Sequence, residues 1–338
     1  RGLIIVPRSA LVEQLYSDFA DYSVKNGKNM EKYCHRVYSG KDKITDKPIC
    51  ISTWQSLQRM PKEYFEQFDY VICDEVHQAQ AKALTDILSK CTKASYRLGV
   101  TGTLSGAKAH EWQLVGLFGQ IYRATTSAEL MAKKQLAKLT IKCLLLKYSE
   151  EECQYMKSAS YQDEIEYIVS NKERNKFICN LALSLEGNTL LLFNYVEKHG
   201  KVLYDMLQQK VKEGRKVFFI HGGTEVEDRE SIRRIIETEH DAIIVGSVGV
   251  LSTGTNIVAL DNVIFASPSK SKVRNLQSVG RGLRINSTKQ SATLFDIADD
   301  FKWKAHDNYT LKHFFERLKT YGEEKFHFKI YKIKVKET

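Results

Sequence analysis

The sequence predicts an α/β protein of two domains, each built on a parallel sheet covered by helices. Two observations lead to this prediction. Short, continuous runs of aliphatic and β-branched residues alternate with helical stretches, and the alternation starts again after a polar, mixed stretch at residues 105–138. The chain also has 338 residues, which is long for one hydrophobic core and ample for two.

The first domain is expected over residues 1–126. Its first strand, at residues 3–6, is ended by Pro7, which has no amide proton to give to a sheet. The next apolar runs predict strands at residues 49–52, 70–73 and 96–101. Helices are expected at residues 10–22, from residue 53 onward, and as connections within 105–138.

The second domain is expected over residues 127–300 and opens with a strand at 139–148. Further strands are predicted at residues 189–193, 216–220, 242–245, 262–266 and 292–296, with helices at 198–213 and 228–239. Residues 149–172 are charged and lack an apolar period, which favours a linker or an inserted arm. Residues 301–338 are expected to form a basic, aromatic C-terminal extension with a weak strand pattern at 326–330.

Composition narrows the class of protein. The chain holds 51 Lys and Arg against 41 Asp and Glu, a formal charge of +10, which favours a polyanionic partner without excluding a soluble protein that is merely basic. Seven cysteines lack any C-x-x-C pair, so we expect no zinc site and a reduced, intracellular protein. No apolar run approaches the ~20 residues of a membrane span, so no membrane partner is expected.

Asp74 and Glu75 directly follow the apolar strand at 70–73. One carboxylate there can hold Mg²⁺ through water while its neighbour polarises an attacking water. An acidic pair after a strand is weak evidence taken alone, and His77 alone is more often a surface or capping residue.

Two arginines form a second candidate group. Arg281 and Arg284 follow Gly280 and Gln277, and cations there can offset charge on a transferred phosphoryl group. Small residues after strands, at 101–103, 221–223 and 252–256, can let backbone amides approach phosphate. Each group alone also fits an ordinary surface or loop.

The order of these groups along the chain strengthens the evidence that they form a functional site. Seven of them follow predicted strands at their carboxyl ends, where α/β sheets bind ligands, and chance agreement at so many places is improbable. The groups are residues 7–14, 53–55, 74–77, 101–103, 190–194, 252–256 and 277–284.

In this arrangement the chain resembles the superfamily 2 helicases. Asp-Glu-Val-His at 74–77, Thr-Gly-Thr at 101–103 and Gln-x-x-Gly-Arg-x-x-Arg at 277–284 resemble motifs II, III and VI of that family. Residues 7–14 resemble motif Ia, and residues 252–256 resemble motif V. Within the superfamily the chain is most similar to phage recombination helicases. The stretches that carry this second resemblance are 51–57, 114–119, 250–254 and 323–326.

The resemblance implies two RecA-like domains in tandem, ATP and Mg²⁺ as cofactors, and roles for named residues. Asp74 would bind Mg²⁺ through water, Glu75 would be the catalytic base, and Arg281 and Arg284 would be catalytic cations, with Arg284 the arginine finger. The residues that would line the nucleotide site are Gln277, Gly254, His77 and Gly280. The residues that would contact nucleic acid are Arg8, Ser9, Gly40, Thr53, Gly222 and Thr253.

The sequence departs from the family pattern in three ways. Arg8 and Asn256 stand where many relatives carry Thr and Asp. No G-x-x-x-x-G-K-S/T run, the loop that cradles phosphates, occurs in the chain. Because Arg1 begins within the pattern of the first strand, we expect the chain to be truncated before motif Ia, the first domain to be incomplete, and ATP hydrolysis by these residues alone to be negligible.

The expected function is that of an ATP-dependent DNA helicase or translocase acting on branched DNA or R-loops in recombination, repair and fork processing. Its partner would be single-stranded, forked or branched DNA or an RNA–DNA hybrid, in the cytoplasm, or the host cytoplasm for a phage protein. One alternative is an RNA helicase or a restriction-type translocase subunit. Another is a non-catalytic protein that binds or anneals nucleic acid.

Overall fold

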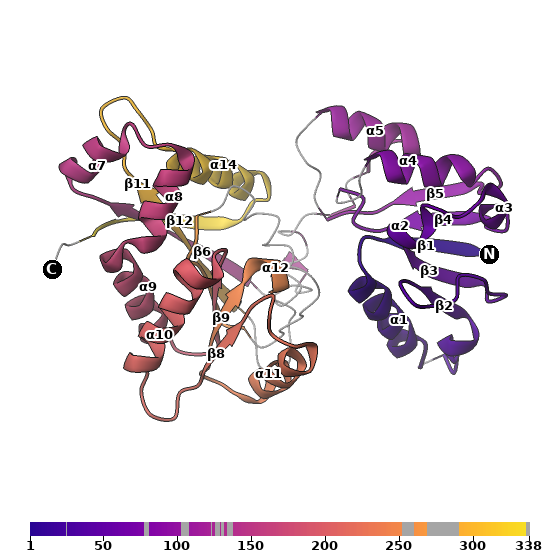
Figure 1. Cartoon of the computed structure of the whole chain (residues 1–338), viewed down its shortest axis with the longest axis horizontal. Helices are drawn as coiled ribbons and strands as arrows, with labels where there is room; N and C mark the ends of the chain where they lie inside the picture. The colour runs from indigo at the N-terminus through magenta and orange to yellow at the C-terminus, as the bar shows by residue number, and fades with distance from the viewer. Residues whose placement is uncertain are drawn as a thin grey trace. The chain divides into compact units, whose positions relative to one another are not determined.

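The computed structural model describes residues 1–24, 26–77, 81–102, 108–122, 124–125, 129, 132–133, 138–251, 260–268 and 291–335. These residues form two compact units, Arg1–Arg123 and Ala124–Thr338, each with its own sheet (Figure 1). Every strand pairing within the two sheets is parallel. The predicted α/β class with two parallel sheets is therefore confirmed.

Sheet A of the first unit has five strands in the order β2-β3-β1-β4-β5. They are β1 (Gly2–Val6), β2 (Cys34–Val37), β3 (Ile49–Thr53), β4 (Tyr70–Cys73) and β5 (Tyr96–Gly99). The helices of this unit are α1 (Ser9–Val24), η1 (Met30–Lys32), α2 (Trp54–Leu57), α3 (Lys62–Phe65), α4 (Ala81–Lys90) and α5 (Lys108–Phe118).

Helices cover both faces of sheet A, which explains why β1 is apolar at every position. Ile4 and Val6 point to one face and pack with Val12 of α1. Leu3 and Ile5 point to the other face, into a core that α2, α3 and α4 complete. Figure 1 shows α1 on one side of the sheet and α4 and α5 on the other.

Sheet B of the second unit has seven strands in the order β12-β6-β11-β10-β7-β9-β8. They are β6 (Lys138–Lys147), β7 (Thr189–Phe193), β8 (Val217–Ile220), β9 (Ile243–Ser247), β10 (Asn262–Phe265), β11 (Ser291–Asp300) and β12 (His327–Lys334). The helices are α7 (Glu150–Met156), α8 (Tyr161–Ser170), α9 (Lys172–Ser184), η2 (Val196–Gly200), α10 (Lys201–Lys210), α11 (Val226–Thr238), α12 (Val248–Leu251) and α14 (Tyr309–Glu323).

Sheet B is also covered on both faces. α11 and α14 pack on one face, where Phe314 of α14 joins the core. α9 and α10 pack on the other face, where Ile178 and Leu203 are fully buried. Two independent cores therefore stabilise the two units.

Residues 149–172 differ from the linker or arm expected from the sequence, because they fold as α7 and α8. Ser149 and Ser160 each cap a helix with a reciprocal capping box. α8 buries Ile165 and Ile168, but its fourth residue, Glu164, is also buried. A carboxylate on the buried face interrupts the apolar period that would have indicated this helix.

The C-terminal residues likewise belong to the second sheet. β12 pairs in parallel with β6 along its whole length and forms the edge of sheet B, and α14 packs on the sheet before it. Most β12 side chains are exposed. Lys329, Lys332 and Lys334 therefore lie on a folded edge strand.

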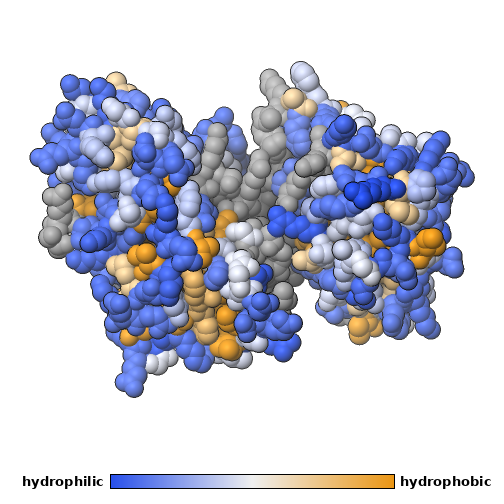
Figure 2. Space-filling model, viewed as in Figure 1, coloured by the Kyte–Doolittle hydropathy of each residue, from blue (hydrophilic) through white to orange (hydrophobic). Residues whose placement is uncertain are grey.

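The surfaces of both units are mostly hydrophilic in the view of Figure 2, with hydrophobic residues in small, scattered groups. Among the described residues, no helix combines the length and apolar character that crossing a bilayer requires.

Candidate active site and nucleic-acid contacts

Asp74 and Glu75 lie at the carboxyl end of β4. The Asp74 amide donates to the Ile5 carbonyl over 2.9 Å, which extends the pairing of β4 with β1 by one residue. The strand order of sheet A reverses between β1 and β4, since β2 and β3 lie on one side and β5 on the other. α/β sheets bind ligands in the crevice at such a reversal. The two carboxylates therefore occupy the expected ligand position of this sheet.

The backbone around the two carboxylates is tightly constrained. Glu75 has a φ of 50°, in the left-handed region that costs a non-glycine residue about 1–3 kcal/mol. Its amide donates to Asp74 Oδ1 over 2.8 Å, which orients the Asp74 carboxylate. Strained residues of this kind gather at functional sites, where surrounding contacts hold them.

His77 connects this turn to the end of β5. Its Nδ1 atom lies 2.6 Å from Thr101 Oγ1 and 3.3 Å from Glu75 Oε2, and its side chain is only 8% exposed. The Val76 amide donates to the Val100 carbonyl over 3.2 Å, which keeps the two strand ends together. The structure thus brings together side chains predicted from two separate motifs. Thr103, the last residue of the second motif, lies outside the described residues.

The donor set at this turn suits Mg²⁺ shared with a phosphate substrate. Mg²⁺ in nucleotide sites is held by one or two carboxylates, with waters and substrate phosphates completing its shell. Asp74 and Glu75 supply two such carboxylates. Among the described residues, no cluster of three or more His, Cys, Asp or Glu side chains is arranged to hold a metal ion on its own.

Thr53 lies at the carboxyl end of β3 and caps α2. Its hydroxyl accepts the Ser56 amide over 3.4 Å and lies 3.0 Å from the Ser56 hydroxyl, and the residue is 5% exposed. In the same loop, the Gln55 amide group donates to the Pro7 carbonyl over 3.1 Å, joining the connection after β3 to the one after β1. Thr53 therefore shapes the loop that would face nucleic acid.

The other described candidates for nucleic-acid contact are exposed. Arg8 and Ser9 follow β1 at the start of α1, and Gly40 follows β2 in a turn with a φ of 80°. In the second unit, Gly222 follows β8, and its carbonyl accepts a hydrogen bond from Arg229 over 3.0 Å. Because all these strands are parallel, each residue lies at the carboxyl edge of its own sheet.

Six candidates lie outside the described residues: Gln277, Gly280, Arg281, Arg284, Thr253 and Gly254. The chain enters residues 269–290 from the carboxyl end of β10 and returns at the start of the adjacent, parallel β11. Pro268, the last described residue before the arginine-bearing segment, therefore lies beyond the carboxyl end of β10.

Sequence reasoning did not identify Arg174, which fixes the chain just before that segment. Its guanidinium group is fully buried, pairs with both oxygens of Asp299 at 2.7 and 3.0 Å, and donates to the Ala266 carbonyl over 2.8 Å. The available signal was Asp299 itself, a charged residue at the end of an apolar run, because a buried carboxylate needs a cationic partner.

His199 was also missed, and its partner Ser267 directly follows Ala266, the residue that Arg174 contacts. The buried imidazole Nδ1 lies 2.7 Å from Ser267 Oγ, and Ser267 Oγ accepts the Asn194 amide over 3.1 Å. Since Asn194 follows β7, these bonds join the ends of β7 and β10. No local sequence pattern indicates such a contact between distant segments.

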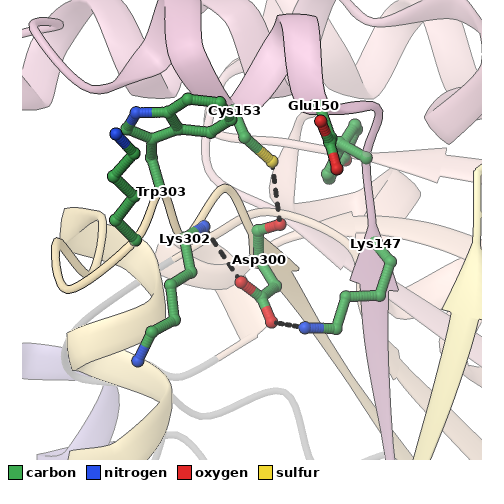
Figure 3. Close-up of a pocket in the computed structure, with 8 residues that line it drawn as sticks. Lys147, Glu150, Cys153, Asp300, Lys302 and Trp303 are labelled. Atoms are coloured by element: carbon green, nitrogen blue, oxygen red, sulfur yellow. Dashed lines mark hydrogen bonds and ion pairs between the residues drawn. The ribbon is translucent and has the colours of Figure 1, made fainter.

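A separate pocket of about 430 Å³ lies at the carboxyl ends of β6 and β11 in the second unit (Figure 3). Lys147 and Asp300 form an ion pair in it, and Cys153 points to the Asp300 carbonyl. Lys302, Trp303 and Lys304 also line it. None of the site residues predicted from the sequence lines this pocket.

Known proteins resemble the chain in both halves. Residues 1–106 match the family model for the res subunit of type III restriction enzymes, and residues 173–286 match the model for the helicase conserved C-terminal domain. The ATP-dependent DNA helicase UvsW of Enterobacteria phage T4 is 34% identical over 96% of this chain and 67% of its own length. A putative ATP-dependent RNA helicase of Acanthamoeba polyphaga mimivirus is 25% identical over 96% of this chain and 61% of its own length.

Solved structures agree with these relatives. The crystal structure of T4 UvsW has a TM-score of 0.53 at 32% identity, covering 99% of this chain and 68% of that one. The type ISP restriction-modification enzyme LlaBIII, bound to DNA, has a TM-score of 0.64 at 14% identity over 98% of this chain, which shows the shared fold alone. The resemblance inferred from the motifs is thus confirmed, and the chain belongs to the superfamily 2 ATP-dependent helicases of the UvsW type.

Proposed function

We propose that the chain forms the motor of an ATP- and Mg²⁺-dependent DNA helicase or translocase that acts on forked or branched DNA and on R-loops. The observation that carries this proposal is the group Asp74, Glu75, His77 and Thr101 at the strand-order reversal of sheet A. It occurs in a chain 34% identical to a DNA helicase.

Glu75 is the proposed base for ATP hydrolysis. A water attacks the γ-phosphorus, the bond from that phosphorus to the bridging oxygen of ADP breaks, and the water proton passes to the Glu75 carboxylate. The contact with His77 and the left-handed backbone hold this carboxylate in one orientation. Asp74 would hold Mg²⁺ through water, and the ion supplies positive charge that offsets the charge of the phosphates.

The family resemblance adds the arginines to the proposed nucleotide site. Arg281 and Arg284 would stabilise charge on the transferred phosphoryl group, while Gln277, Gly280 and Gly254 would border the nucleotide. The bonds that Arg174 and His199 make to Ala266 and Ser267 support this role, because they fix the point from which the arginine segment departs.

The proposed link between nucleotide and movement is His77. Its Nδ1 atom contacts both the carboxylate of the proposed base Glu75 and the hydroxyl of Thr101, which follows β5. A change at Glu75 on hydrolysis would therefore reach the segment that follows β5.

Nucleic acid would lie along the carboxyl edges of the two sheets. Arg8, Ser9 and Gly40 would contact it from the first unit, where the buried Thr53 would position the segment after β3, and Gly222 and Thr253 would contact it from the second. The formal charge of +10 supports a phosphate-rich partner.

A second candidate is an RNA helicase or a restriction-type translocase subunit. The relative from mimivirus is named as an RNA helicase, and the family model over residues 1–106 is that of a restriction enzyme subunit. The residues of the site do not separate these substrates, because the hydrolysis chemistry is common to all of them.

Unwinding assays distinguish the candidates. The full-length protein is given ATP with a DNA fork, an R-loop or an RNA duplex. We expect ATP-dependent unwinding of the fork and the R-loop. Unwinding of RNA alone would favour the RNA helicase, and ATP-driven movement along duplex DNA without strand separation would favour the restriction-type translocase. Strand annealing that is indifferent to ATP would favour a non-catalytic binding protein.

A further inference from the structure

The connection between β11 and α14 is held rigidly at its α14 end. Asn308, only 3% exposed, accepts the Phe301 amide over 3.0 Å and donates to Glu164 over 2.7 Å. The buried Glu164 carboxylate also accepts the amides of Tyr309 and Thr310 at 2.9 and 2.8 Å. The side chains that this connection exposes are therefore presented from a fixed backbone.

A tight turn forms the middle of the connection. Trp303 and His306 exchange two backbone hydrogen bonds of 3.0 and 2.9 Å, and Lys304 at the turn has a φ of 51°. Trp303 is partly buried against the small apolar cluster that contains Phe301. Phe301 in turn stacks on Tyr148 at 4.0 Å between ring centroids. The Trp303 indole is thus held in place by packed aromatic side chains.

Cations lie beside the aromatic rings of the connection. Lys304 Nζ is 5.9 Å from the Trp303 ring centroid, and Lys312 Nζ is 5.7 Å from that of Tyr309. Tyr309 is 43% exposed. Neither Lys304 nor Lys312 forms an ion pair with a carboxylate of the described residues, whereas Lys302 pairs with Asp307 at 2.9 Å. The connection therefore offers two uncompensated positive charges, each next to a ring.

The pocket of about 430 Å³ opens between this connection and the end of β6 (Figure 3). Trp303 lies beside Cys153 on one side of it, and the Lys302 side chain extends away from Asp300. The Asp300 charge is compensated by Lys147. The volume falls within the range of about 300–1,000 Å³ that small-molecule sites occupy.

The position of the connection matches a nucleic-acid track. β11 runs parallel to β7, β8 and β9 in sheet B, so the connection leaves the same edge as the loops that carry Asn194 and Gly222. A polymer lying along that edge would meet both regions of the second unit.

We propose that the β11–α14 connection is an additional contact for single-stranded nucleic acid, in which Trp303 and Tyr309 stack on bases while Lys304 and Lys312 pair with phosphates. The inference rests on the proposed nucleic-acid function, to which it adds a binding surface. Single-strand binders combine ring faces, which accept any base, with cations that follow the backbone. An acidic protein partner would use the lysines but not the ring faces, so the two components can be tested separately.

The test measures binding of labelled oligo-dT and oligo-U to the 338-residue chain over a series of KCl concentrations. Each phosphate contact on a single strand contributes about 0.7 to the slope of log affinity against log salt. Lys304→Gln with Lys312→Gln should lower that slope by about 1.4. The control is Lys210→Gln with Lys212→Gln, an equal charge change at two exposed lysines. Both lysines precede β8, so they lie toward the amino ends of the strands and away from the carboxyl ends where the connection lies. This variant should leave the slope unchanged.

The ring component has its own readout. Trp303→Leu keeps the apolar packing but removes the flat ring, and it should weaken binding about tenfold without changing the salt slope. Trp303→Phe should restore most of the affinity. Wild-type affinity in Trp303→Leu together with a wild-type slope in the lysine variant would overturn the assignment of this connection, while the proposed function stands. If the unsubstituted chain bound neither oligonucleotide, the proposed function would fail together with the inference.

Discussion

Glu75 shows how four consecutive residues build the turn that carries the proposed catalytic base. Asp74 accepts the Glu75 amide, Glu75 adopts a left-handed backbone, and His77, two residues later, returns to the Glu75 carboxylate. The left-handed turn costs about 1–3 kcal/mol, and these contacts together with the pairing of Val76 to Val100 hold it. The spacing of the Asp-Glu-Val-His motif therefore has a local physical reason, which is why the motif could be recognised from sequence.

Burial in the hydrophobic cores also changes the acidity of the cysteine thiols. All seven are buried. Burial raises the pKa of Cys50 and Cys91 to about 11, and that of Cys143 and Cys179 to about 12. Because the thiolate is the reactive form, we expect native protein to resist iodoacetamide at pH 8 and all seven thiols to react after unfolding in urea. Rapid alkylation of the native chain would contradict the described burial.

The same shifts set a dependence of stability on pH. The ordinary thiol pKa of 9.0 applies to the unfolded chain, and the folded values are higher. Between these values the folded state binds more protons than the unfolded state, so the stabilisation is complete below pH 9 and is lost as the pH rises toward 12. The urea concentration at the midpoint of unfolding should be lower at pH 10 than at pH 8. In the Cys143→Ala variant this decrease should be smaller.

At the scale of elements, buried ion pairs tie helices to β11. Arg174 of α9 pairs with Asp299, and Arg317 of α14 pairs with Asp296, all four side chains being at most 2% exposed. Each pair joins one covering helix to the same strand from opposite faces of sheet B. β11 is thereby held at its carboxyl end, next to the connection proposed to contact nucleic acid.

Breaking one of these pairs should be costly. Arg174→Met leaves Asp299 charged and buried, and we expect a loss of about 3–5 kcal/mol in the free energy of unfolding, measured with urea. Adding Asp299→Leu should recover most of that loss because no charge then remains unpaired. Lys201→Met breaks an exposed pair with Asp205 and should cost no more than about 1 kcal/mol. Equal losses in Arg174→Met and Lys201→Met would contradict the burial argument.

These buried ion pairs also show which features of the fold could not be predicted from the sequence. The strand at residues 3–6 was foreseen because helices cover both of its faces and every position is apolar. β11 was expected to end at Asp296 but extends to Asp300, because Asp296 and Asp299 pair with arginines from distant helices and Asp300 pairs with Lys147 of β6. α8 was not predicted because Glu164 interrupts its apolar pattern, and the hydrogen-bond partners of Glu164 lie far along the chain, from Asn308 onward. Contacts between distant segments leave no local pattern.

The residues of the candidate site also differ in whether a local sequence pattern indicates them. Asp74, Glu75 and His77 were found because a short motif carries their geometry. Arg174 and His199 were missed because they act through residues 92 and 68 positions away. The roles of Arg281 and Arg284 stay predictions that rest on the family resemblance.

At the scale of the whole molecule, the chain spans 67% of the length of UvsW and carries two sheets with separate cores. The carboxylates follow a strand of the first unit, and the arginine segment follows a strand of the second. An enzyme that needs both groups needs both units, so nucleotide turnover should depend on each of them.

The most direct test of this account is ATP hydrolysis with and without forked DNA, using the full-length protein and its Glu75→Gln variant. We expect DNA-stimulated hydrolysis in the unsubstituted protein and a loss of at least about a hundredfold in the variant, with DNA binding retained, because only the base is removed. DNA-stimulated hydrolysis of equal rate in both proteins would contradict the assignment of Glu75 and with it the proposed motor.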